Sequence, residues 1–226
     1  TNAGYAGTII FTSNIIENGE NKGIAALFVE KDTDGLRIGP KEHKMGWRGS
    51  DTRAVYFDNM KIPKKNILGA PGKGFKQFLK TLTGGRISIS ALAVGTAEGA
   101  YELALKYSNE RDAFGKKINN FQAVGFKLAD MATQIEASKQ LTYHAAWLKD
   151  NKKDVIKEAA MAKLFSSEAA MKITTEAIQI HGGYGYIKEY DVERFFRDAK
   201  ILEIGEGTSE IQRIVILREI LNNSIL

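Results

Sequence analysis

The chain changes its hydrophobic period near Gly74, and this change constrains the possible fold more than any other feature. Beyond it, apolar and small residues recur at helical spacing over about 74–110, 120–149, 154–180 and a final pair of segments around 191–222. In the second segment a single stripe continues for about seven helical turns. The stripe consists of Phe121, Val124, Leu128, Met131, Ile135, Ser138, Thr142 and Ala145.

The third segment carries small residues that let neighbouring helices approach closely. These residues are Ala159, Ala160, Ala162, Ala169, Ala170 and Ala177. Several long amphipathic segments joined by short connections are typical of an antiparallel helical bundle. We therefore predict such a bundle over residues 72–226, with the domain junction at Pro71-Gly72.

Residues 1–71 have the pattern of β structure, with strand-like runs at 8–11, 25–29 and 54–57. Turns are predicted at Asn18-Gly19, Asp34-Gly35 and Gly39-Pro40. The chain opens on Thr1 without a methionine start, so we expect an antiparallel β-barrel or sheet that lacks its earlier strands. The predicted fold class is α+β.

Composition excludes several classes of protein. With 43% hydrophobic and 26% charged residues, the chain resembles an ordinary folded protein, and no run reaches the roughly 20 apolar residues of a membrane span. We expect a soluble protein that does not bind membranes. The absence of cysteine excludes disulfides and thiolate catalysis, and the widely separated His43, His144 and His181 give no reason to expect a metal site.

The net charge of +5 comes from lysines scattered among nearly as many acids. The strongest local cluster surrounds Pro63 and could meet nucleic acid or the phosphates of a small ligand. Charge alone does not choose between these partners. A solvated surface is the simplest interpretation, and we expect no nucleic-acid binding.

Residues 204–212 hold the densest group of polar residues that helical periodicity does not require. Ser209 and Gln212 have capping-box spacing, which predicts that a helix starts at Ser209. Glu206 then lies between two glycines just before a helix N-terminus, where a carboxylate could serve as a general base. It could equally be an acid that the helix dipole favours.

A glycine cluster at residues 182–185 ends the third helical segment. It is either a glycine C-cap with a tight turn or a place where backbone approaches a dinucleotide. The cluster follows a helix and lacks the GxGxxG spacing, so it is not a Rossmann fingerprint.

Two further positions interrupt helical patterns. Arg111 lies before an aromatic residue and a glycine, and an arginine at such a corner either forms a surface ion pair or grips a pyrophosphate. Gln122 opens the next segment and would face the same corner. Gly84-Gly85 lies in the first long segment, where each glycine destabilises a helix by about 1 kcal/mol relative to alanine. The pair either allows close helix packing or leaves space beside a ligand.

Six phrases in one order resemble the acyl-CoA dehydrogenase family, most closely its short-chain (butyryl-CoA) members. They are residues 45–50, 84–87, 111–115, 121–122, 177–186 and 206–213. The resemblance implies the second half of a middle β domain over residues 1–71. It also implies a C-terminal four-helix bundle over residues 72–226, which assembles a homotetramer or homodimer.

The resemblance also implies roles for individual residues. Glu206 corresponds to the catalytic base. The substrate-binding positions are Thr83, Gly84, Gly85, Arg86 and Gly207. The positions that bind FAD, some of them in a neighbouring subunit, are Thr1, Arg111, Gln122, Gln179, Ile180, His181, Gly182, Gly183, Thr208, Ser209 and Glu210.

The implied activity is FAD-dependent conversion of short, straight-chain acyl-CoA to trans-2-enoyl-CoA, with electrons passed to electron transfer flavoprotein. Branched-chain and long-chain relatives place the base beside Arg86, whereas this chain has Gly85 there, so Glu206 is the matching candidate. Gly205 replaces the usual aromatic residue and leaves the preferred chain length open.

Several alternatives share this resemblance. They are an enoyl-CoA reductase, an acyl-CoA oxidase, a nucleic-acid-associated relative without activity, and a bundle that serves only oligomerisation. The expected compartment is the bacterial cytoplasm or, in a eukaryote, the mitochondrial matrix. We expect the isolated 226 residues to be inactive and to hold FAD poorly.

Overall fold

The computed structural model of the protein describes residues 1–223. It divides into two compact units, residues 1–82 and residues 83 onward, and each is described by itself. The division falls inside the first long helix, so the domain boundary expected at Pro71-Gly72 stays a prediction. Helices combined with small antiparallel sheets confirm the α+β class.

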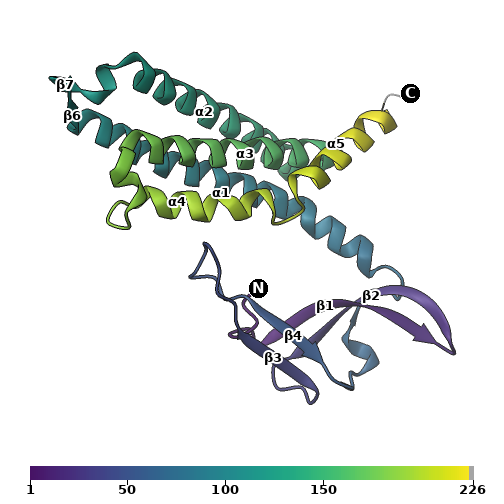
Figure 1. Ribbon diagram of the computed structural model, residues 1–226. Helices are drawn as coiled ribbons and strands as arrows, with labels where there is room; N and C mark the ends of the chain where they lie inside the picture. Colours follow the sequence, from purple (N-terminus) through teal and green to yellow (C-terminus); the bar gives the residue numbers. More distant parts are fainter. Residues whose placement is uncertain (224–226) are drawn as a thin grey trace. The chain divides into compact units, whose positions relative to one another are not determined.

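Two strands, β1 (Thr8–Glu17) and β2 (Glu20–Glu30), form the main hairpin of the first unit (Figure 1). Asn18 and Gly19 between them have φ values of 52° and 80°, as a tight two-residue hairpin turn requires. The turn predicted there is confirmed. β5 (Ile67–Leu68) pairs with the other edge of β2.

A second sheet pairs β3 (Leu36–Lys41) with β4 (Arg53–Phe57). The turn predicted at Asp34-Gly35 is confirmed, because Gly35 has a φ of 84° just before β3. The turn predicted at Gly39-Pro40 is wrong, because both residues lie inside β3. The pairing register shifts at this point, and a proline without an N–H is tolerated at such an irregularity. The described strands form small open sheets rather than a closed barrel.

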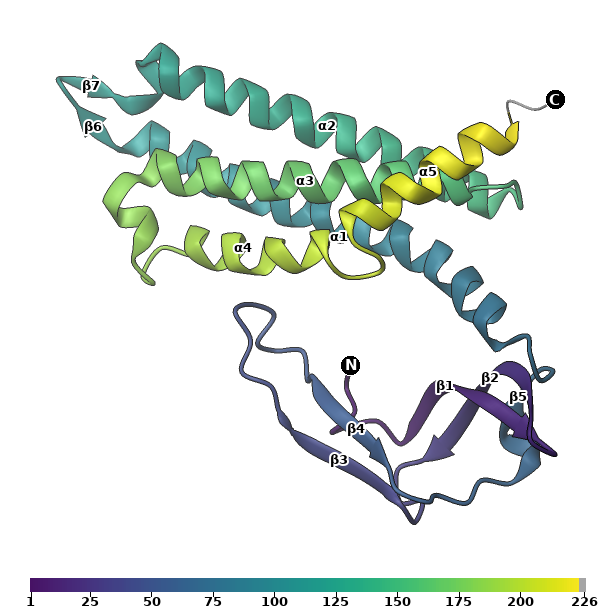
Figure 2. The same cartoon turned by 45° about the vertical axis from the view of Figure 1, so that its right-hand side comes forward.

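The second unit is helical, and its elements agree closely with the predicted segments. The helices are α1 (Gly74–Glu110), which starts in the first unit, α2 (Gln122–Asp150), α3 (Ile156–His181), α4 (Val192–Ala199) and α5 (Ser209–Asn223). Helix α3 contacts α2, α4 and α5 (Figure 2). It is therefore the helix on which α2, α4 and α5 pack.

The predicted stripe of α2 is confirmed as the buried face of that helix. Its buried members are Leu128, Met131, Ile135, Ser138, Thr142 and Ala145. The six alanines singled out in α3 are all buried as well. Ser90 of α1 shares hydrogen bonds with Thr142 of α2 at 2.6 Å and with Ser166 of α3 at 2.9 Å, which joins the three helices through their hydroxyls.

A small hairpin between α1 and α2 was not predicted. β6 (Asp112–Ala113) pairs with β7 (Lys116–Lys117) around a turn in which Phe114 and Gly115 have φ values of 51° and 80°. The strands are only two residues long, so periodicity carries no signal for them.

None of the helices in residues 1–223 combines the length and the apolar character needed to cross a lipid bilayer.

Candidate functional site

Glu206 lies in the loop between a 3₁₀ turn, Lys200–Glu203, and α5. Glu206 and Gly207 have φ values of 55° and 93°, so two consecutive residues are in the left-handed region. For a non-glycine residue this conformation is uncommon, and it persists only where the surrounding structure holds it. A Cβ on Gly207 would also lie 2.8 Å from Gln212 Nε2, which gives a second reason for glycine there.

Two fully buried side chains hold the carbonyl groups of this loop. Gln212 Nε2 donates to the Glu206 carbonyl at 3.1 Å and to the Gly207 carbonyl at 2.8 Å. Lys163 Nζ, from α3, donates to the same Gly207 carbonyl at 2.8 Å. Both side chains have 0% exposure. The loop is therefore fixed to α3 and α5 from inside the unit.

Helix α5 starts at Ser209 as predicted, but the capping box is wrong in detail. The Thr208 hydroxyl accepts the Ile211 N–H at 3.4 Å, which makes Thr208 the capping residue. The Ser209 hydroxyl is buried and makes no hydrogen bond with any described residue. Gln212 serves the loop carbonyls instead of reaching back to close the box. A hydrogen bond from Thr208 is the main cause that lowers the pKa of the Glu210 carboxyl.

The Glu206 carboxylate rests against the glycine surface of α1. A Cβ built on Gly85 would lie 2.8 Å from Glu206 Cδ and closer still to Oε2. Any side chain at position 85 would therefore have to displace this carboxylate. Of the two reasons considered for the paired glycines, close approach is observed at Gly85, and what approaches is the candidate base.

Arg86, the next residue of α1, is 5% exposed and lies near the same loop. Burial is the main cause that lowers the pKa of its guanidinium; Arg218 also lowers it, whereas Glu206 raises it. Arg86 Nε is buried without a hydrogen-bond partner in the described part of the chain. Burial is also the main cause that lowers the pKa of Lys163, and the charge of Arg86 lowers it further. Arg86 is thus a buried cationic side chain that lies close enough to Glu206 to attract it, whereas Lys163 reaches the loop at the Gly207 carbonyl.

A second group of predicted residues meets where α3 ends. Arg111, Ile180, His181, Gly182 and Gly183 line one hollow of about 500 Å³. Gly182 ends the helix with a φ of 59°, which confirms its predicted role as a C-cap. The hollow shows that this cap and an open surface coexist at the same residues.

Aromatic rings shape the hollow. His181 stacks on Tyr107 at a centroid distance of 4.3 Å, and its Nδ1 lies 2.8 Å from the Ala177 carbonyl. Burial is the main cause that lowers the pKa of His181, so the neutral ring is favoured. The guanidinium of Arg111 lies 5.6 Å from the ring centre of Tyr184. A planar cation and flat rings suit a ligand that carries both phosphate and a flat base.

Three other predicted flavin-binding residues are exposed. Gln122 and Gln179 are exposed on α2 and α3, outside the described lining of the hollow. Thr1 is exposed at the start of the first unit. Within the helical unit the structure therefore brings most of the predicted residues into two groups, one around Glu206 and one around Gly182. A Cβ on Gly84 would instead face Lys149 Nζ at 2.7 Å.

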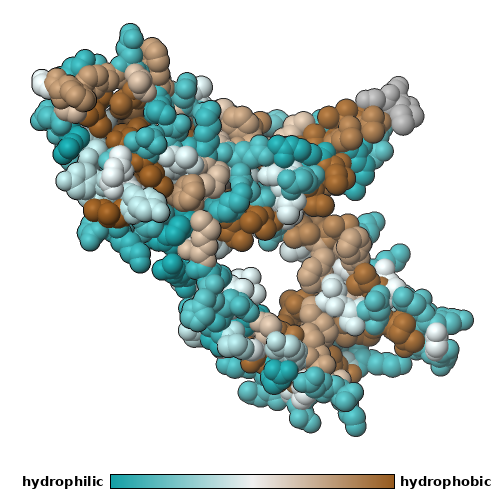
Figure 3. Space-filling model, in the orientation of Figure 1, coloured by the Kyte–Doolittle hydropathy of each residue, from teal (hydrophilic) through white to brown (hydrophobic). Residues whose placement is uncertain are grey.

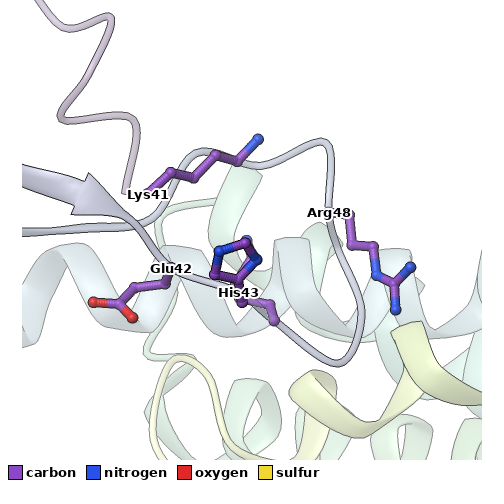
Figure 4. A pocket seen from close by; sticks show the side chains of 5 residues that line it. Lys41, Glu42, His43 and Arg48 are labelled. Atoms are coloured by element: carbon purple, nitrogen blue, oxygen red, sulfur yellow. The ribbon is translucent and has the colours of Figure 1, made fainter.

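Sequence reasoning missed a hollow of about 600 Å³ in the first unit. It is lined by Lys41, Glu42, His43, Lys44 and Arg48 (Figure 4). The ammonium of Lys44 is engaged by the Ser50 carbonyl at 2.6 Å and by the Thr52 hydroxyl at 2.9 Å. Sequence reasoning also missed the buried Lys163. Its signal was a lysine four residues from Ala159 on a face otherwise made of small residues.

Comparison with known proteins gives consistent results. The sequence profile described as acyl-CoA dehydrogenase, C-terminal domain, matches residues 72–221. The chain is 55% identical over 222 residues to the probable acyl-CoA dehydrogenase YngJ of Bacillus subtilis, covering 98% of this chain and 58% of that protein. It is 47% identical over 208 residues to the subunit CarC of the caffeyl-CoA reductase-Etf complex of Acetobacterium woodii, covering 92% and 55%.

Among solved structures, butyryl-CoA dehydrogenase from Megasphaera elsdenii superposes with a TM-score of 0.93 at 46% sequence identity. The match covers 97% of this chain and 57% of that one. The chain therefore spans a little more than half the length of the proteins that it resembles.

Proposed function

Because the chain belongs to the acyl-CoA dehydrogenase family, we propose that it supplies the catalytic base and parts of the flavin and thioester sites of an enzyme that desaturates acyl-CoA. The observation that carries the proposal is the placement of Glu206. Its carboxylate is half-buried on the glycine surface of α1, and its backbone is held in a left-handed turn. A solvated surface acid has no need of such an arrangement.

The reaction requires a base and an electrostatic environment together. The α hydrogen of a thioester is too weak an acid for a carboxylate in water, so the enolate-like charge must be stabilised as it forms. We propose that Glu206 takes the α proton, with its own N–H directed at the thioester oxygen. The β hydrogen leaves with its electron pair, and bound FAD supplies the hydride acceptor.

Both groups of residues fit a flavin. We propose that Thr208, Ser209 and Glu210 contact FAD, and the Ser209 hydroxyl is a buried group that lacks a partner among the described residues. We further propose that Arg111, Gln122 and residues 179–183 contact the FAD of a neighbouring copy, because the hollow at Gly182 combines a cation with flat rings. Thr1 remains a proposed flavin contact on the resemblance alone.

The proposed substrate is a short, straight-chain acyl-CoA thioester. Thr83, Gly84, Gly85, Arg86 and Gly207 are its proposed contacts. Three of the substrate positions, Gly85, Arg86 and Gly207, adjoin the carboxylate or loop of Glu206. The similarity to a butyryl-CoA dehydrogenase supports short chains.

We propose electron transfer flavoprotein as the electron acceptor and a homotetramer or homodimer as the assembly. In this proposal α1, α2, α3 and α5 form the four-helix bundle, with the cytoplasm or the mitochondrial matrix as compartment. Apolar side chains lie along α5 (Figure 3), where Ile214, Leu217 and Leu221 are 61%, 56% and 53% exposed. Such a stripe supports burial against another subunit.

One alternative keeps the same site and reverses the direction of the reaction. CarC, a subunit of a complex named as a reductase, is 47% identical to this chain. In an enoyl-CoA reductase Glu206 would protonate the α carbon, and bound reduced FAD would supply the hydride that the β carbon needs. The geometry of the base serves either direction, because each step is the reverse of the other.

Anaerobic titration of the complete polypeptide with butyryl-, valeryl- and octanoyl-CoA tests the proposal. We expect the flavin absorbance to bleach, most strongly with butyryl-CoA. Titration of the reduced enzyme with crotonyl-CoA measures the opposite direction. The proposal fails if no acyl-CoA bleaches the flavin. The 226-residue chain alone is the comparison, and we expect it neither to retain FAD tightly nor to turn over substrate.

A further inference from the structure

Lys163 is the largest fully buried side chain among residues 1–223. A buried ammonium is costly unless hydrogen bonds or an ion pair compensate for lost water. Within the described residues Lys163 forms no ion pair, and its one hydrogen bond from the side chain is to the Gly207 carbonyl at 2.8 Å. The polar contact that compensates for burial of this lysine is therefore a backbone carbonyl of the Glu206 loop.

The acceptor of this bond is shared. The Gly207 carbonyl also accepts from Gln212 Nε2 at 2.8 Å, and the same nitrogen donates to the Glu206 carbonyl at 3.1 Å. Both carbonyl groups of the left-handed pair are thus tied by buried donors from α3 and α5. The conformation at Glu206, with its φ of 55°, is one that a free loop would rarely adopt.

These hydrogen bonds also determine the direction of the Glu206 carboxylate. Reversal of the left-handed turn would redirect the Glu206 side chain away from Gly85, the residue against which it rests. We propose that Lys163 and Gln212 are positioning residues that hold the Glu206 and Gly207 carbonyls, so that the carboxylate is already aimed before substrate binds. This inference rests on the proposed function only for its effect on rate, because the hold on the loop is a separate property.

The charges that face Lys163 do not provide another explanation for its burial. Glu203, Glu168 and Glu210 act on its pKa from the 3₁₀ turn, α3 and α5, and Arg86 acts from α1 with the opposite sign. Burial lowers the pKa and is the largest of these causes. Both an amine and an ammonium donate N–H, so the bond to Gly207 survives either protonation state.

Lys163→Met is the main test, made in the complete, flavin-loaded enzyme. Methionine keeps most of the packing volume and removes the donor, and it also removes the cost of burying an ammonium group. We expect an unchanged or higher melting temperature with a kcat lower by about 100-fold and a KM within about threefold of the parent. A purely structural lysine would instead change stability and leave kcat alone.

Ser167→Ala is the matched control. Ser167 lies one turn further along α3 and is equally buried, and among residues 1–223 its hydroxyl donates only to the Leu164 carbonyl of its own helix. We expect its kcat and loop exchange to match the parent. Gln212→Met is the second variant, which removes the other donor if Lys163→Met fails to fold. The double variant should lose less kcat than the product of the two single losses, because Lys163 and Gln212 both donate to the Gly207 carbonyl.

Hydrogen exchange separates this inference from the proposed function. The amides of residues 205–208 should exchange about tenfold faster in Lys163→Met and Gln212→Met, and no faster in Ser167→Ala. Unchanged exchange in both donor variants overturns the inference even in an active enzyme. Faster exchange in an enzyme that desaturates no acyl-CoA leaves the hold on the loop established and refutes the proposed function instead.

Discussion

Two glycine-bearing corners of the helical unit look alike in sequence and differ in structure. The loop at residues 204–208 comes before α5, and the corner at residues 182–185 comes after α3. Buried donors hold the first from within, whereas Gly182 and Gly183 of the second are exposed on a hollow of about 500 Å³. Glycine therefore allows a fixed left-handed conformation in the first corner and leaves the surface open in the second.

The comparison separates a loop that contacts within the helical unit fix from a corner that is open to a ligand. A loop tied on both carbonyls is complete without another molecule, and it carries the one carboxylate that we propose as a base. The exposed corner combines a cation with flat rings, and we propose it as one wall of the flavin site. Substitutions in the first corner should therefore act on rate, and those in the second on retention of the flavin.

The largest effect is expected for Glu206→Gln in the complete enzyme. Glutamine keeps the size of the side chain but cannot take a proton, so exchange of the substrate α proton should fall by at least about 1,000-fold. Exchange is measured by deuterium loss from labelled butyryl-CoA, with flavin content and thioester binding as controls. Unchanged exchange would remove Glu206 from the mechanism.

Gly85→Ala should produce the next largest effect. The new Cβ would occupy the space of the Glu206 carboxylate, so kcat should fall by about 10- to 100-fold with the fold preserved. Gly95→Ala is the control on the same helix, because a methyl group at that position would meet no described atom within 4 Å beyond the neighbouring residues and backbone of its own helix. It should stabilise α1 by about 0.5 to 1 kcal/mol and leave kcat alone. Equal kinetics for the two variants would contradict the proposed contact.

Arg111→Gln tests the open corner. Loss of the guanidinium should weaken retention of FAD by about tenfold, measured by the rate of flavin release, with α-proton exchange little changed once flavin is saturating. Lys117→Gln is the matched control. It removes another cation from the same hairpin, and that cation forms an exposed ion pair with Asp112 at 2.7 Å. A similar release rate in both variants would argue against a flavin contact at Arg111.

The smallest effect concerns the dependence of stability on pH. Burial holds the pKa of His181 below its ordinary 6.5, so the unfolded chain takes up this proton more readily than the folded one. Stability that depends on neutral His181 is therefore present above about pH 6.5 and lost as the pH falls below it. His181→Phe should keep the stack on Tyr107 and flatten this part of the profile, measured by denaturant melts.

His144, exposed on α2, provides the comparison for that measurement. His144→Asn removes an exposed imidazole and serves as the reference variant. An equal flattening in both variants would assign the slope to something other than burial of the ring at the open corner.

Much of the architecture followed from periodicity. The spacing of apolar residues predicted the long helices nearly to their ends, because each must bury a stripe. Local turn chemistry predicted Asn18-Gly19 correctly. It failed at Gly39-Pro40, since a strand in a two-stranded sheet can contain a proline where the pairing shifts. The two-residue strands β6 and β7 were too short for any periodic signal.

The sequence by itself determined that the chain is α+β, which faces of α2 and α3 are buried, and that Glu206 lies between glycines before a helix. Only the tertiary structure decided that Thr208 caps α5, that Gln212 holds the loop, and that Lys163 reaches it from α3. Lys163 and Gly207 are 44 residues apart in the chain. Contacts between such distant residues depend on how helices pack, and neither local propensity nor spacing contains that information.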